Sequence, residues 1–234
     1  AYVLYTFIPA MLIWSQARFS GKIKSSLLRY TIAPLILVVT VVGGYFFLLN
    51  LSKSAGKYSL ENVQNLAEGF QDWHTYLAET RDQSGYSLGE VQFTPLGVLQ
   101  KTPEAIFVTY YRPRLDEIRN FATAFESLQS TLLLLITIYI LFKVGLIRFF
   151  RIMLSNREVR AFMLFALLLG IAVGLTSYNF GALSRYKIPS LPFFTASLAI
   201  VYYIGSNNKA MAAASKLRNK NPLNRRQNPL MKKA

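Results

Sequence analysis

Five apolar segments, each nearly free of charge, most constrain what this chain can fold into. A helix needs about 20 apolar residues to cross a bilayer, and its backbone polar groups must be satisfied internally. Hydrophobic residues make up 53% of the 234 residues, as in membrane proteins. The sequence therefore predicts an all-α polytopic membrane protein with about five transmembrane helices. The predicted spans are residues 1–14, 31–51, 131–147, 161–178 and 188–204.

The charged residues predict how these spans are oriented. Ten of the 11 acidic residues fall in the second connection, residues 52–130, whereas the first connection, the third connection and the C-terminal tail are strongly basic. Cytoplasmic loops are enriched in Lys and Arg, so the basic connections and the C-terminus are predicted to be cytoplasmic. The acidic connection and the short connection around Arg185 then face outward. Topology thus explains the net charge of +15, and no nucleic-acid partner is expected.

Four regions follow from this topology. Two spans with a basic cytoplasmic loop occupy residues 1–51, an outward-facing helical region follows at 52–130, and three more spans occupy 131–206. Residues 207–234 form a basic cytoplasmic tail. We expect the tail to be poorly ordered or to lie along anionic lipid head groups, because it has no acidic residue and little apolar periodicity.

The outward region is predicted to contain amphipathic and re-entrant helices. Apolar residues recur at three- and four-residue spacing after Ser59, which indicates an amphipathic helix. At Thr102, a capping threonine followed by proline and glutamate is typical of a helix start. This helix should run to Arg112 as a half-buried or re-entrant segment, since it is too short to span. From Leu115 a further helix is expected to continue without a break into the span at 131–147.

Composition excludes several classes of active site. The chain has no cysteine, so disulfides and thiolate metal sites are absent, and His74 is the only histidine. No two acidic residues of the outward region have a spacing that forces their carboxylates together. No metal site is therefore assigned, and a divalent cation is the one cofactor left open. The predicted spans contain no acid, which argues against ion-coupled transport.

Cations near the outer interface are the strongest candidates for chemistry. Arg112 and Arg114 follow the short helix, and Arg185, Tyr186 and Lys187 occupy the fourth connection. The planar guanidinium group fits phosphate and diphosphate oxygens, and tyrosine can stack on a sugar or line a lipid cleft. We therefore assign these five residues as candidate lipid-phosphate-binding residues. The alternative is that they are ordinary interfacial anchors.

The fourth connection and the start of the last span carry a motif that reads SRYKIP at residues 184–189 and LPFF at 191–194. It resembles the C-terminal end of bacterial C-type polytopic glycosyltransferases, the lipid-linked-sugar-dependent enzymes related to the protein mannosyltransferase and aminoarabinose transferase families. The segment FTPLGVLQKTPEAI at 93–106 and the tripeptide YRP at 111–113 look like parts of Bacteroidetes-type surface-polysaccharide membrane proteins.

The resemblance implies an enzyme of the bacterial inner membrane that takes a sugar from a polyprenyl phosphate or diphosphate on the outer face. Arg185 and Lys187 would bind the donor phosphate, and Arg112 and Arg114 would form a second clamp. In that family the catalytic acid belongs to a first outer loop, which this sequence lacks. No catalytic residue is therefore assigned, and we expect the chain to be the C-terminal portion of a longer protein. A processed N-terminus is the alternative.

Two other classes of function stay open at this point. The first is a non-catalytic membrane subunit of an envelope or export complex. The second is a lipid-linked oligosaccharide flippase or polymerase, which also needs outward cations but requires a continuous cavity across the bilayer. The expected partners are membrane lipids, a polyprenyl-phosphate-linked sugar and, for the subunit, other membrane proteins.

Overall fold

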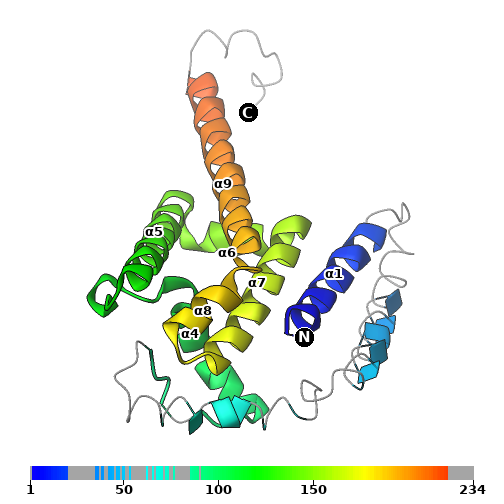
Figure 1. Cartoon of the computed structure of the whole chain (residues 1–234). Coiled ribbons are helices and arrows are strands. Elements are labelled where there is room, and N and C mark those ends of the chain that lie inside the picture. The colour runs from blue at the N-terminus through cyan, green and yellow to red at the C-terminus, as the bar shows by residue number, and fades with distance from the viewer. Residues whose placement is uncertain are drawn as a thin grey trace.

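The computed structural model describes residues 2–20, 85–89 and 91–220, together with scattered positions between 35 and 76, and for residues 208–220 it describes the backbone alone. Within these residues every regular element is helical, and β-type pairing is limited to one isolated bridge between Gly85 and Asn179. Figure 1 labels the helices α1 (Tyr2–Ser20), α4 (Pro95–Tyr111), α5 (Phe121–Val144), α6 (Leu146–Ser155), α7 (Arg157–Thr176), α8 (Phe180–Lys187) and α9 (Leu191–Lys220). A short 3-10 helix, η2 (Leu115–Glu117), lies between α4 and α5 in the chain.

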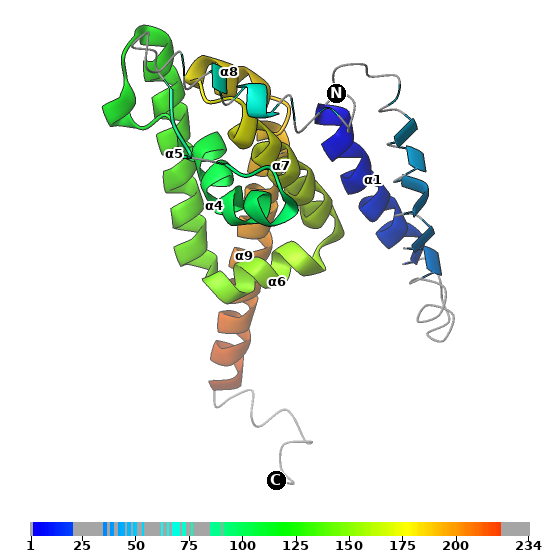
Figure 2. The same cartoon turned by 90° about the horizontal axis from the view of Figure 1, so that it is seen from below.

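Helix α7 lies at the centre of the fold and contacts α1, α4, α6, α8 and α9. Helix α6 lies crosswise between the ends of α5 and α7, and α8 lies at the opposite end of α7 (Figure 2). Helix α9 runs back from α8 past α6 and projects beyond it. The two ends of the bundle are therefore distinct, and we name them the α8 end and the α6 end.

Two of the described helices, α5 and α7, are long and apolar enough to cross a membrane. A third crossing results if α8 and the first part of α9, which meet at a bend of 64°, are counted as one broken span. Helix α1 contains a shorter apolar stretch, Val3–Gln16. The prediction of an all-helical membrane protein is confirmed at this level. The predicted span at 31–51 lies largely outside the described residues, so the number of five crossings stays a prediction.

Close contact between α4 and α7 is made possible by small residues. A Cβ atom on Gly174 would lie 2.3 Å from the backbone oxygen of Ala105, and one on Gly170 would lie 2.8 Å from the ring of Tyr110. Glycine at these two positions lets the backbones approach, as in other membrane helix pairs. Gly170 and Gly174 are therefore packing residues of the α4–α7 contact.

Hydroxyl groups strengthen this contact by donating to one row of α7 carbonyls, spaced four residues apart along the helix. Such spacing places all three acceptors on a single face of α7. The bonds are Tyr110 Oη to the Ala166 oxygen at 2.7 Å, Thr109 Oγ1 to the Gly170 oxygen at 2.7 Å, and Tyr86 Oη to the Gly174 oxygen at 2.8 Å. We call these three bonds the hydroxyl ladder. They fix α4 and the preceding loop against α7.

Helix α4 begins eight residues earlier than predicted. Thr94 is the N-cap, its side chain accepts from the backbone N–H of Gly97, and Pro95 occupies the first turn. The Thr94-Pro95 pair has the same cap-and-proline chemistry as the pair at Thr102, so the first of the two starts the helix. Pro103 is therefore inside α4, and the predicted start at Thr102 was wrong. The predicted end at Arg112, which is the C-cap, is confirmed.

The continuous helix expected from Leu115 is interrupted. Leu115 belongs to the short η2 turn, and α5 begins only at Phe121. Asn120 caps α5, because its side chain accepts from the backbone N–H of Thr123 while the Thr123 hydroxyl group accepts from the N–H of Asn120. Asn120 itself has extended backbone, with φ at −152° and ψ at 173°, so a helix cannot continue through it. The resulting α5 starts ten residues before the predicted span at 131–147.

Two segments expected to be connections are helical. The third connection contains α6, and the polar segment around Arg185 forms α8, which Asn179 caps by accepting from the N–H groups of Gly181 and Ala182. The predicted boundary at residue 207 is not a helix end, since the backbone of α9 is helical to Lys220.

Candidate functional site

The candidate site lies at the α8 end, where α8 directs its side chains to two sides. Arg185 and Tyr186 are exposed, the latter by 57%, and the Arg185 Nε group donates to the Gly181 oxygen one turn earlier at 3.0 Å. Lys187 points the other way and is only 1% exposed. Leu183, one turn before Lys187, is also fully buried. The predicted phosphate-binding residues of this connection are thus separated into two exposed side chains and one buried side chain.

Lys187 joins three elements. Its Nζ atom donates to the backbone oxygen of Arg112, the last residue associated with α4, and to Ser130 Oγ on α5, both at 3.3 Å. Ser130 Oγ in turn donates to the same Arg112 oxygen at 2.9 Å. Glu126 is the acidic residue that acts electrostatically on the Lys187 ammonium group. We call Glu126, Ser130, Lys187 and the Arg112 carbonyl the buried cluster.

The side chain of Arg112 is also fixed by neighbours. Its Nε atom donates to Glu117 Oε2 at 3.1 Å, and a second guanidinium nitrogen contacts Glu117 Oε1. The guanidinium carbon lies 5.3 Å from the centre of the Phe180 ring and 5.7 Å from that of Tyr86. Arg112 therefore holds the η2 turn against the start of α8. A cation over an aromatic face is favourable at these distances.

Arg114 forms an exposed pair with Asp116. Its Nε and Nη2 atoms donate to the two carboxylate oxygens at 3.0 and 2.5 Å. These hydrogen bonds hold the pKa of the Asp116 carboxyl below its ordinary value. Exposed ion pairs contribute little to stability, because water and salt screen them.

The pKa of the Glu117 carboxyl is also lowered, but here partial burial opposes the hydrogen bonds. Partial burial alone would raise the pKa of its carboxyl, but the hydrogen bonds from the Arg112 guanidinium and from the Arg114 backbone N–H outweigh that effect. The net pKa lies below the ordinary value of 4.5. The carboxylate therefore stabilises the η2 turn at neutral pH, and this stabilisation is lost as the pH falls below 4.5 through the lowered value.

A Glu117→Gln variant is expected to loosen the η2 turn at neutral pH. Hydrogen–deuterium exchange of the amides at 112–118, corrected for the intrinsic exchange rate, should become faster and lose its dependence on the protonation of residue 117. Asp116→Asn is the matched control, because it breaks the exposed pair and should leave exchange nearly unchanged. Equal exchange in wild type and Glu117→Gln at neutral pH would contradict the assigned role.

The five predicted site residues do not converge on one open pocket. Lys187 meets the backbone of Arg112, and the Arg112 side chain covers the start of α8, whereas Arg185 and Tyr186 are exposed and Arg114 pairs with its neighbour. An apolar cavity of about 440 Å³ lies between α1, α4 and α7, and none of the five lines it. The residues on its wall include Tyr5, Phe93, Leu99, Leu168 and Thr176.

Sequence reasoning missed Glu126 and Ser130 as members of the site, because both preceded the predicted span. A usable signal exists in α5, where four hydroxyl-bearing residues recur at spacings of three, four and seven and are all buried. They are Thr123, Ser127, Ser130 and Thr137. Hydroxyl groups on the inward face of an apolar helix indicate that polar partners lie opposite.

No group of three or more His, Cys, Asp or Glu side chains that could hold a metal ion occurs among the residues that the structure describes. Comparison of the chain with known protein families, with curated proteins and with solved structures gives no match. The functional assignment therefore depends on the residues and on their geometry.

Proposed function

We propose that this chain belongs to a glycosyltransferase-like protein of the bacterial inner membrane that binds a polyprenyl-phosphate-linked sugar during assembly of cell-surface polysaccharide or glycoconjugate. On this proposal the α8 end faces outward and the C-terminus is cytoplasmic, in keeping with the distribution of Lys and Arg. The observation that carries the proposal is the exposure of Arg185 and Tyr186 on a helix that the buried Lys187 anchors.

Anchoring matters because a binding group is most effective when its position is fixed before the ligand arrives. Lys187 ties α8 to α4 and α5, and Arg112 packs on Phe180 at the start of α8. Because α8 is held at both ends, the exposed Arg185 side chain has a fixed position from which to bind a phosphate. We assign Arg185 to the phosphate and Tyr186 to the sugar or the first prenyl units, with Arg112 and Lys187 as positioning residues.

The apolar cavity between α1, α4 and α7 supports the same proposal. Thr176, on its wall, ends α7 only a few residues before α8 begins. Aliphatic and aromatic side chains line it, as a prenyl chain would require. We propose that the prenyl chain occupies this cavity while its phosphate reaches Arg185. Arg114 stays a secondary candidate, since its exposed pair with Asp116 can open at low cost.

Arg185→Ala is expected to weaken binding of a polyprenyl phosphate by about tenfold to 100-fold, because hydrogen bonds to a charged group contribute about 1.5–3 kcal/mol. Native mass spectrometry of the detergent-solubilised protein with added polyprenyl phosphate measures this. Arg185→Lys should recover only part of the affinity, since lysine lacks the planar fork.

Arg160→Ala is the control for loss of one cation, because Arg160 lies at the α6 end and bonds to the Leu154 oxygen. It should bind polyprenyl phosphate as wild type does. If Arg185→Ala kept wild-type affinity while the protein stayed folded, the phosphate assignment would be wrong.

A non-catalytic membrane subunit is the second candidate, favoured by the outer surface of α5. Large aromatic residues are strongly exposed along this helix, with Phe121 at 79%, Phe125 at 62% and Phe142 at 84%. Such a surface suits lipid or another membrane protein. Copurification of a stoichiometric partner in mild detergent, lost on Phe125→Ser, would favour the subunit over the enzyme.

A further inference from the structure

The short helix α6 has three faces of different character. Leu146, Ile147, Phe150 and Leu154 are exposed on one face, with Ile147 reaching 77% exposure. A second face, represented by Phe149 and Ile152, is buried against α7 and α9. An exposed apolar face on a helix that lies crosswise to the bundle is typical of a helix in the membrane interface.

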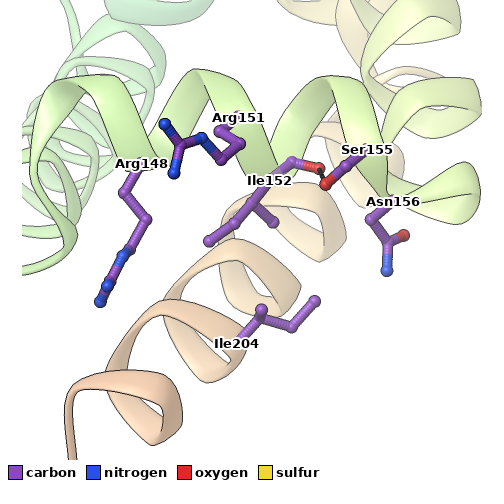
Figure 3. Close-up of a pocket in the computed structure, with 6 residues that line it drawn as sticks. All are labelled: Arg148, Arg151, Ile152, Ser155, Asn156 and Ile204. Carbon is purple, nitrogen blue, oxygen red and sulfur yellow. Dashed lines mark hydrogen bonds between the residues drawn. The ribbon is translucent and has the colours of Figure 1, made fainter. Parts of the chain in front are cut away.

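Arg148, Arg151 and Ser155 form the third face of α6, at the three- and four-residue spacing that places them in one row. They border a cavity of about 400 Å³. Ile152 of α6, Asn156 after α6 and Ile204 of α9 complete its wall. Figure 3 shows the two arginines leaving α6 one turn apart, with Ile204 on the facing helix. The cavity lies in the corner where α9 passes α6.

Few acidic groups balance these arginines. Glu158, the only acidic residue between 127 and 234, is engaged by Arg157, whose Nη2 atom lies 2.9 Å from its carboxylate. Arg148 donates only a long bond of 3.5 Å to the Gly205 oxygen. The Arg151 side chain makes no hydrogen bond or ion pair with any residue that the structure describes. Two guanidinium groups therefore border a cavity with their donors largely unused.

The geometry points to a binding site for the phosphate group of an anionic phospholipid, formed by Arg148 and Arg151 at the α6 end. The guanidinium groups contact the phosphate oxygens, Ser155 and Asn156 offer polar contacts to the head group, and Ile204 closes the cavity. This site is separate from the proposed polyprenyl-phosphate site, because it lies at the opposite end of α7 and does not depend on it.

A membrane lipid fits this site better than a soluble phosphate compound does. The exposed apolar face of α6 adjoins the arginine face, so acyl chains can lie along Phe150 and Leu154 while the head group sits in the cavity. A soluble phosphate would use the arginines alone and leave the apolar face unexplained. Each Lys or Arg near an anionic membrane surface adds about 1 kcal/mol to the attraction.

The test is lipid binding by the detergent-solubilised full chain, followed by native mass spectrometry during titration with phosphatidylglycerol. The Arg148→Gln/Arg151→Gln double variant should bind phosphatidylglycerol roughly tenfold or more weakly than wild type. Arg157→Gln/Arg160→Gln removes the same charge from the start of α7 and should bind within about twofold of wild type. Equal losses in both double variants would overturn the site in favour of diffuse electrostatic attraction.

Three further comparisons use the same measurement. Ser155→Phe keeps both arginines and fills the cavity, so it should weaken binding even if an arginine variant folds poorly. Phosphatidylcholine, whose head group is neutral overall, should bind less tightly than phosphatidylglycerol, and equal affinity would overturn the anionic specificity. Glycerol 3-phosphate should not displace the lipid, since it lacks acyl chains. Its displacement of the lipid at a comparable concentration would show that the cavity takes a soluble phosphate and would overturn the lipid assignment.

Discussion

Replacing Lys187 by methionine is expected to lower the free energy of unfolding by about 2–4 kcal/mol, because it removes the donor from a buried polar cluster. Methionine retains much of the volume, so the loss isolates the ammonium group. The Arg112 oxygen would lose one of its two donors, and Glu126 would lose the cation that acts on it. One carboxylate oxygen of Glu126 is already buried without a hydrogen-bond partner in the described structure.

Unfolding of the detergent-solubilised protein, followed by circular dichroism during a denaturant titration, measures the effect. Arg185→Met is the matched control, since it makes a similar change two residues away on the exposed side of α8 and should leave the midpoint nearly unchanged. The double variant Lys187→Met/Glu126→Gln should recover part of the lost stability, because it removes the uncompensated charge. A wild-type midpoint for Lys187→Met would show that the buried cluster contributes nothing to the fold.

Gly174→Ala is expected to lower the free energy of unfolding by about 2–3 kcal/mol through overpacking. The new Cβ atom would lie 2.3 Å from the Ala105 oxygen and 2.8 Å from Thr109 Oγ1. Backbone atoms cannot rotate away as a side chain can, so α4 must shift from α7. The shift would also lengthen the bonds of the hydroxyl ladder. Rotamer changes cannot bring the two helices back to their original distance, because the clash involves backbone atoms.

The denaturant titration used for Lys187 also measures this variant. Gly69→Ala provides the control, because a Cβ atom at Gly69 meets no described atom within 4 Å. Alanine there should be neutral or slightly stabilising, since it has the higher helix propensity. A wild-type midpoint for Gly174→Ala would contradict the overpacking explanation.

Apolar length was enough to predict an all-helical fold with membrane-spanning helices, because a membrane restricts the chain to a few solutions. Helix boundaries were harder to predict where two similar signals compete. Thr94-Pro95 and Thr102-Pro103 are both acceptable starts, and the structure uses the first of them. Helix α6 was missed because its ten residues are too few to span and its basic residues resemble those of a loop.

The candidate residues were chosen from the sequence by residue type, and their geometry was not predicted. Residue types identified Arg185 and Lys187 together, because both are cations between two apolar segments. Their burial differs because they are two residues apart on a helix, which places them about 200° apart around its axis. A loop would have imposed no such separation, so the missing fact was that Asn179 starts a helix there.

Helix α4 ends inside the protein, and a helix end requires partners for its last carbonyls. The Arg112 oxygen obtains two of them from other helices, Ser130 and Lys187. Lys187 therefore serves as a C-terminal cap supplied from a distance, and its charge complements the negative end of the α4 dipole. A count of cations in the sequence therefore overstates the positive charge available to a ligand at the α8 end. Lys187 is included in that count, but its charge already interacts with the C-terminal end of α4.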